Sequence, residues 1–305
     1  MSEMPQVTFC ECFARDGLQH EPGILPATEK AAMLEKIADC GFRRIEITSF
    51  SHPKYVPQFA DADAVLAAVA PRPGVLFKAT CPNPAAVKRA LATSRRPEEI
   101  SFLVSASEGH TQRNLKRSRA EQWAQVVEMA ALAGDDFTTV GTISVALDCP
   151  FDGPTPPGRV VDDAQRFVEL GVKRIAIGDT IGSGTPPRIK ALMRLLKSEL
   201  PEDVVLIAHF HDSRGTGIAN CVAALEAGVT YFDTALGGTG GHPAEIAYGE
   251  GFTGNVGSED LATLFEAMGV RTGLNIEALR DAGRAAEALL GRRLHSRTVR
   301  LGEHA

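Results

Sequence analysis

The stretch ELGVKRIAIGDT (169–180) runs from the end of a helical pattern through a glycine into a run of apolar and β-branched residues. The same order recurs in DCGFRRIEITS (39–49) and in EAGVTYFDTA (226–235). A glycine commonly ends a helix because it tolerates left-handed backbone angles, and a short apolar run after it indicates a buried strand. The repeated stretch therefore predicts units in which each helix leads directly into a strand of a parallel sheet.

Further strand and helix patterns alternate along the rest of the chain. Besides the three stretches above, the sequence predicts strands at 7–13, 75–79, 99–105, 140–148 and 204–211. Helical patterns lie between them at about 28–40, 61–70, 84–94, 118–133, 160–171, 186–199, 217–228 and 259–268. Eight strands alternating with eight helices predict a (β/α)₈ TIM barrel of the α/β class. A doubly wound open sheet has the same alternation, but no GxGxxG follows the first strand.

The last part of the chain predicts one more helix. Residues 275–293 have a helical pattern, and we expect the segment 275–305 to be a helical tail packed outside the barrel. No Pro/Ser-rich linker interrupts the sequence, so we predict a single catalytic domain over 1–305.

Composition excludes several classes of protein. The 305 residues are 44% hydrophobic and 23% charged, which allows a large buried core. The net charge is −6 and the basic residues are scattered, so nucleic acid is not an expected partner. No apolar run reaches the roughly 18 residues that span a bilayer, so no membrane association is expected. The N-terminus MSEMPQVTF lacks a signal pattern and the six cysteines form no CxxC, which predicts a reduced, cytoplasmic protein.

Ionisable residues collect where the predicted strands end, which is where barrels carry their chemistry. They are Arg15 and Asp16 at the end of strand one, Glu46 in strand two, Asp179 at the end of strand six, His209 and His211 at the end of strand seven, and Asn255 after the glycine-rich loop LGGTGGHPAEIAYGEGFTGN (236–255).

His209 and His211 form the sharpest pair. Residues i and i+2 of a strand point to the same face, so both imidazoles can reach one metal ion. The alternative is that one is a hydrogen-bonding core residue and the other is solvated. Asp16 favours the metal, because a closed barrel brings strand one beside strand eight and near strand seven. A set of two histidines and an aspartate, with no thiolate, favours Mg²⁺ or Mn²⁺.

Arg15, Glu46 and Asp179 each allow two interpretations. Arg15 would place a permanent cation beside the metal, suited to a developing enolate oxygen, or it makes a surface salt bridge. Glu46 is an acid/base group or a buried carboxylate paired with an arginine. Asp179 is an acid/base group or a cap on the turn that follows it.

Several motifs resemble those of the 3-hydroxy-3-methylglutaryl-CoA lyases, a family of metal-dependent lyase barrels. ARDGLQHEPGILPATEK and IEITSFSHPKYVPQFAD correspond to the family's RDGLQNE and IETTSF blocks. SASEGHTQRN, ALDCPFDG, IGDTIGSGTP, HFHDSRG and TGNVGSEDL follow in the family's order, so the similarity extends from residue 7 to about 295.

The resemblance implies an enzyme that splits a carboxylated 3-hydroxyacyl-CoA into acetyl-CoA and a keto acid by a retro-Claisen step. It implies metal ligation by Asp16, His209, His211 and Asn255, with Arg15 stabilising the thioester enolate and Glu46 and Asp179 in the acid/base network. We further predict substrate contacts from Gln19, His20, Asn83, Ser107 and Thr180. The expected partner is an acyl-CoA substrate, and a homodimer is the common assembly of the family.

One position departs from the family pattern. The family's loop reads GGCP, with the cysteine nine residues before the metal-binding asparagine, whereas this chain reads GGHP, with His242 thirteen residues before Asn255. Three explanations stay open: His242 donates the proton in place of cysteine; the longer loop reshapes the pocket for another substrate such as citramalyl-CoA; or lyase activity is lost. A solvated loop residue without a role is the plainest interpretation of His242.

The hypotheses for the whole chain follow from these alternatives. The first is a divalent-metal carbon–carbon lyase acting on a substrate like HMG-CoA or citramalyl-CoA. The second is a Claisen-type condensing enzyme of the isopropylmalate synthase group, and the third is a catalytically silent metal- or ligand-binding protein.

Overall fold

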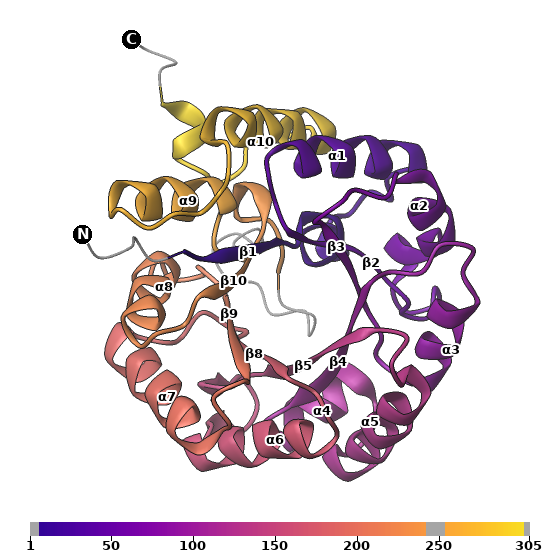
Figure 1. Cartoon of the computed structure of the whole chain (residues 1–305), viewed down its shortest axis with the longest axis vertical. Coiled ribbons are helices and arrows are strands. Elements are labelled where there is room, and N and C mark those ends of the chain that lie inside the picture. The colour runs from indigo at the N-terminus through magenta and orange to yellow at the C-terminus, as the bar shows by residue number, and fades with distance from the viewer. Residues whose placement is uncertain (1–5, 242–253, 302–305) are drawn as a thin grey trace.

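The computed structural model describes residues 6–241 and 254–301, which form a closed barrel surrounded by helices (Figure 1). The barrel strands are β1 (Thr8–Glu11), β2 (Arg44–Ser49), β3 (Leu76–Thr80), β4 (Glu99–Ser105), β5 (Thr138–Ser144), β8 (Arg174–Asp179), β9 (Val205–Phe210) and β10 (Tyr231–Thr234). All neighbouring strands are parallel, and β1 closes the circle by pairing with both β2 and β10. The predicted TIM barrel is confirmed and the open sheet is wrong.

Helices cover the outside of the barrel. They are α1 (Ala27–Asp39), α2 (Ala62–Ala68), α3 (Pro84–Ala92), α4 (Glu108–Leu115), α5 (Arg119–Ala133), α6 (Pro157–Glu169), α7 (Pro186–Glu199), α8 (Gly217–Glu226), α9 (Ser258–Ala267) and α10 (Ile276–Leu290). The opening stretch behaves as its pattern predicts: Gly171 has φ +83° between α6 and β8, and the glycines at 41 and 228 are also left-handed. The predicted tail helix is α10, which packs on α1 and α9 outside the barrel (Figure 1).

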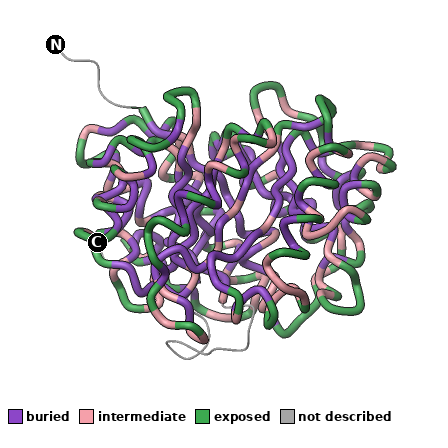
Figure 2. The backbone as a smooth tube through the Cα atoms, turned by 90° about the horizontal axis from the view of Figure 1, so that it is seen from below, coloured by how far each residue is buried: buried purple, intermediate pink, exposed green. Residues whose placement is uncertain are grey.

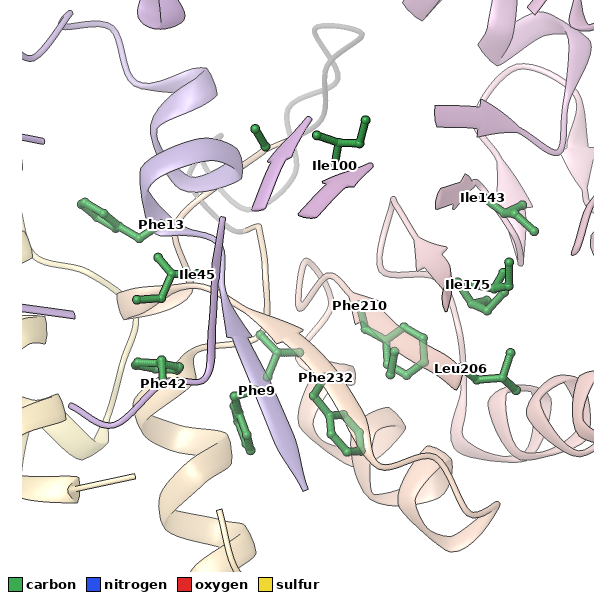
Figure 3. Packing of buried hydrophobic residues seen from close by; sticks show 14 of the residues in the cluster. Phe9, Phe13, Phe42, Ile45, Ile100, Ile143, Ile175, Leu206, Phe210 and Phe232 are labelled. Carbon is green, nitrogen blue, oxygen red and sulfur yellow. The ribbon is translucent and has the colours of Figure 1, made fainter. Parts of the chain in front are cut away.

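The apolar core lies between the strands and the helices. Buried chain runs through the middle of the molecule, and exposed chain lies mainly at its periphery (Figure 2). Phe9 of β1 and Phe232 of β10 are register partners and therefore point to the same side of the sheet (Figure 3). Both rings pack against Phe265 of α9, with centroids 6.0 and 5.1 Å away. Alternate residues of the same strands must then face the barrel interior, where the polar side chains lie.

Two strand ends and one helix differ from the sequence predictions. The first strand ends at Glu11, and residues Phe13–Gly17 form one turn of π-helix, so Arg15 and Asp16 follow the strand instead of ending it. The fifth strand ends at Ser144, and a short hairpin of β6 (Asp148–Cys149) and β7 (Gly153–Pro154) follows. Helix α4 was missed because it carries no apolar stripe.

Two further observations concern the cysteines and the length of the helices. All six cysteines are free and buried, in agreement with the absence of a disulfide framework in the sequence. Among the residues that the structure describes, every helix is too short or too polar to cross a bilayer.

Candidate metal centre

The π-helical turn after β1 presents Arg15 and Asp16 to the mouth of the barrel. Its backbone is held at the base by the buried Glu11, whose Oε1 accepts hydrogen bonds from Phe13 N (2.8 Å) and from Leu236 N (2.9 Å). The second bond joins the end of β1 to the loop after β10. A tight turn anchored in this way holds two adjacent charged residues at the carboxyl end of the barrel.

Asp16, His209 and His211 come together at that end. Asp16 Oδ2 lies 4.0 Å from His209 Nε2 and 3.7 Å from His211 Nε2, and one ligand atom from each of the three residues lies within 4.8 Å of the others. All three side chains are buried. The structure therefore brings together the three residues that the sequence predicted as a metal half-site and its carboxylate.

Asn255 reaches the same cluster from the far end of the glycine-rich loop. Its backbone forms an isolated antiparallel β-bridge with His211, and its side-chain Nδ2 donates a hydrogen bond to Asp16 Oδ2 at 2.6 Å. Its Oδ1 is buried and accepts no hydrogen bond from the described residues. A buried amide oxygen without a donor is costly, and it fits a position for a hard cation.

Packing around Asn255 requires a glycine at 240. Gly240 has φ +121°, and a Cβ atom there would lie 2.6 Å from Asn255 Nδ2. Part of the glycine content of the loop is thus explained by close approach to the cluster and by left-handed backbone.

The donor set fits a divalent cation. Burial alone would raise the pKa of the Asp16 carboxyl, but Arg15 and the two imidazoles lower that pKa well below its usual range. The site therefore offers one ionised carboxylate, two imidazole nitrogens and one unpartnered amide oxygen. Mixed oxygen and nitrogen donors without thiolate suit Mg²⁺, Mn²⁺ or a related ion.

Arg15 is fixed beside this set. Its Nη1 pairs with Asp16 Oδ1, and its Nε lies 2.8 Å from Glu46 Oε2. Burial opposes the charge of the guanidinium, yet the two carboxylates raise its pKa above the usual value, so Arg15 stays cationic. Of the two interpretations of Arg15, the exposed surface salt bridge is not what the structure shows. Glu46 is a buried carboxylate paired with an arginine, and that arginine belongs to the site.

The sequence reasoning missed two buried residues behind the site, Asp233 and Lys78. Asp233 Oδ2 lies 3.3 Å from His209 Nδ1 and 3.4 Å from Lys78 Nζ. The signal was present in both cases as a charged residue inside an apolar strand, in VLFKA (75–79) and in YFDTA (231–235).

The other predicted residues hold turns and helix ends. Both oxygens of Asp179 accept backbone hydrogen bonds, from Ser183 N and Gly184 N, which is the turn-capping interpretation of this residue. Asn83 and Ser107 cap the first turns of α3 and α4 through their side chains. Thr180 Oγ1 accepts from Val145 N at 2.8 Å.

Two further predicted residues follow the π-helix. Gln19 and His20 lie on a 3₁₀ turn, Leu18–His20, directly after the π-helix. The His20 ring is next to Gly241, and burial lowers its pKa. His242, the predicted proton donor, lies outside the described residues.

A parallel barrel with an aspartate, two histidines and an asparagine at its carboxyl mouth defines a divalent-metal barrel enzyme by fold and site. The HMGL-like family model matches residues 6–285 of this chain. The chain belongs to that family.

Named relatives agree with this assignment. The chain is 33% identical over 299 residues to a hydroxymethylglutaryl-CoA lyase of Bacillus subtilis, covering 97% of each chain. It is 36% identical to the (R)-citramalyl-CoA lyase of Chloroflexus aurantiacus, covering 95% of this chain and 93% of that one. An HMG-CoA lyase of Acinetobacter baumannii, solved with coenzyme A and 3-methylmalate, superimposes with a TM-score of 0.91 at 30% identity, over 97% of this chain and 95% of that one.

Proposed function

We propose that this chain is a divalent-metal-dependent carbon–carbon lyase that cleaves a short, carboxylated 3-hydroxyacyl-CoA into acetyl-CoA and a keto acid. The observation that carries the proposal is the buried cluster of Asp16, His209 and His211 with the unpartnered Asn255 Oδ1 beside it. Relatives named as lyases favour this reaction over the condensing enzyme and over a silent binding protein.

Asp16, His209, His211 and Asn255 would hold the cation. A divalent ion there, most suitably Mg²⁺ or Mn²⁺, would make the substrate hydroxyl more acidic and orient it together with the carboxylate. The four residues act by fixing the donor geometry at the mouth of the barrel.

Arg15 would stabilise the enolate of the departing acetyl-CoA. Its guanidinium is permanently charged and already held by Glu46 and Asp16, so it needs no reorganisation when negative charge develops on the thioester oxygen. Glu46 acts through Arg15 by holding its Nε.

Asp179 is proposed to take part in removing the hydroxyl proton. Burial raises the pKa of this carboxyl, which moves it toward the range useful for proton transfer. The backbone N–H groups of Ser183 and Gly184 hold its two oxygens in place at the end of β8.

His242 is proposed to deliver a proton to the enolate carbon. The support is its place in GGHP, where the family's loop carries a cysteine, together with the near-neutral pKa of an ordinary imidazole. We expect His242→Ala to lower kcat about a hundredfold while KM changes little. Steady-state kinetics of acetyl-CoA release measure both constants, and equal turnover in the variant and the wild type would exclude the role.

The substrate class, the assembly and the location are proposed together. Gln19, His20, Asn83, Ser107 and Thr180 are proposed to line the acyl-CoA site, since all of them follow barrel strands at the same end. The homodimer and the cytoplasmic location rest on the family resemblance and on the sequence features described above.

A panel of thioesters tests the function. HMG-CoA and both stereoisomers of citramalyl-CoA are incubated with the protein and Mg²⁺ or Mn²⁺, and acetyl-CoA release is measured. We expect release from at least one. Consumption of acetyl-CoA with a 2-keto acid, and no cleavage of any thioester, would instead support the condensing enzyme.

A further inference from the structure

A row of charged side chains, most of them buried, crosses the barrel interior and ends at the candidate metal centre. In order of contact, this charged row consists of Arg174, Glu99, Arg44, Asp233, Lys78, Glu46, Arg15 and Asp16. Basic and acidic side chains alternate along it, so every charge has an opposite neighbour. Such a row balances charges that would be costly to bury alone.

Lys78 lies between two acidic residues of the charged row. From it, one branch of contacts leads through Asp233 to His209, and a second leads through Glu46 to Arg15. Its ammonium group lies 3.4 Å from Asp233 Oδ2 and 3.5 Å from Glu46 Oε2. The side chain is only 2% exposed, so water does not compensate its charge. The two carboxylates therefore hold Lys78, and Lys78 in turn keeps two like charges close together.

The first branch leads to a proposed metal ligand. Asp233 Oδ2 also lies 3.3 Å from His209 Nδ1. An ionised carboxylate can only accept a hydrogen bond, so Nδ1 carries a proton and Nε2 is the ring nitrogen available to a cation. That Nε2 is the atom facing Asp16, at 4.0 Å. A carboxylate behind a histidine fixes both its tautomer and its ring orientation.

The second branch leads to the proposed enolate-stabilising cation. Glu46 Oε2 contacts Arg15 Nε at 2.8 Å, while its Oε1 accepts a hydrogen bond from Thr80 Oγ1 at 2.6 Å. The carboxylate is thus held from two sides, by Thr80 and by Lys78, and it passes this constraint to the guanidinium.

We propose that Lys78 is a positioning residue shared by the two halves of the site: through Asp233 it orients His209 toward the metal, and through Glu46 it orients Arg15 toward the enolate. The inference rests on the proposed metal-dependent lyase. It adds that the buried ammonium group of Lys78 holds both His209 and Arg15 in their orientations.

The test uses variants that separate the branches. Lys78→Met removes the shared ammonium with little change in volume. Asp233→Asn weakens the contact to His209 while leaving Glu46 and Arg15 in place, and Thr80→Val weakens the Glu46 branch without touching Asp233. Arg174→Met is the matched control, because it removes a cation at the far end of the same row, where the contact is to Glu99.

Each variant is first freed of metal, and the tautomer of His209 is then recorded by ¹⁵N NMR. The Kd is measured by titration with Mn²⁺, and kcat is measured once Mn²⁺ has reached saturation. We expect Asp233→Asn to raise the Mn²⁺ Kd about tenfold or more and to mix the tautomers. Saturating Mn²⁺ should then restore most of its kcat. Thr80→Val should lower kcat at an unchanged Kd.

Lys78→Met should show both defects, with a raised Mn²⁺ Kd and a low kcat that saturating Mn²⁺ does not restore, whereas Arg174→Met should keep its Kd within about threefold of wild type. A Lys78→Met protein that matches Arg174→Met in Kd and kcat overturns the inference. If Lys78→Met does not fold, Asp233→Asn and Thr80→Val decide. A raised Mn²⁺ Kd in Asp233→Asn and a lowered kcat in Thr80→Val support the inference, and any other pattern overturns it. A wild-type protein that binds no Mn²⁺ contradicts the proposed function itself.

Discussion

Among the residues that the structure describes, two clusters of potential metal ligands lie one behind the other in the barrel, and the surroundings of only one suit a metal. The mouth cluster consists of Asp16, His209 and His211, and the inner cluster consists of Cys10, Cys12 and Asp233. In each cluster the ligand atoms lie within 4.8 Å of one another. By residue type and by the distances between ligand atoms alone, both clusters would be candidate metal sites.

Their surroundings separate the two clusters. In the inner cluster Asp233 is already paired with Lys78 and His209, and burial with the neighbouring Cys10 raises the pKa of the Cys12 thiol well above its usual value. Metals bind thiolates, so a thiol that keeps its proton is a poor ligand. In the mouth cluster Asp16 is ionised and Asn255 Oδ1 has no donor among the described residues. Charge balance, more than residue type, selects the mouth cluster.

The largest expected effect comes from Asp16→Ala, which removes the one carboxylate of the mouth cluster. We expect bound Mn²⁺ to be lost and acetyl-CoA release to fall at least about a thousandfold, which corresponds to about 4 kcal/mol of transition-state stabilisation. Metal analysis and turnover are measured on the same preparation. Retained metal in this variant would move the site away from the mouth cluster.

Arg15→Lys comes next in size. A lysine keeps the charge but not the planar donors that contact Glu46 and Asp16 together. We expect kcat to fall about a hundredfold with the Mn²⁺ Kd changed only slightly. Arg89→Lys, at a partly exposed pair with Asp63 outside the barrel, is the control and should match wild type. A loss confined to metal affinity would contradict the enolate role of Arg15.

A smaller effect is expected from Gly240→Ala. The added Cβ would collide with Asn255 Nδ2 and would sit at a left-handed backbone position, so the Asn255 side chain must move from its present place beside Asp16. We expect Mn²⁺ affinity to fall about tenfold, as measured by titration. Gly23→Ala, where a Cβ would meet nothing within 4 Å, should leave affinity unchanged. Equal affinities in the two variants would remove Asn255 from the ligand set.

The smallest effects are expected at the inner cluster. Cys10→Ser and Cys12→Ser should each change the Mn²⁺ Kd and kcat by less than about threefold, because neither thiol is proposed to touch the metal. A larger loss of Mn²⁺ binding in either variant would mean that the inner cluster had been wrongly set aside.

The sequence predicted the barrel well because its signals are local. A glycine after a helix and an apolar run after the glycine, as in ELGVKRIAIGDT, each report on their own neighbourhood. The HxH pattern at 209 and 211 was equally local, since strand geometry alone puts both rings on one face. The π-helical turn that carries Arg15 and Asp16 was missed, because it depends on Glu11 bridging to the backbone of Leu236, far along the chain.

The roles of Lys78 and Asp233 could not be read from the sequence for a related reason. Each appears as one charge in an apolar strand, and such a charge has no meaning until its partners are known. Those partners come from other strands: Asp233 and Glu46 for Lys78, and His209 for Asp233. Pairing across a closed barrel is set by its topology, which single residues do not encode.

The most direct test of metal-dependent cleavage at the mouth cluster is titration of metal-free protein with Mn²⁺, followed by acetyl-CoA release from the best thioester of the panel. We expect one Mn²⁺ to bind per chain, acetyl-CoA release to rise in step with occupancy, and neither binding nor activity in Asp16→Ala. Full activity without metal, or metal bound equally by Asp16→Ala, would contradict it.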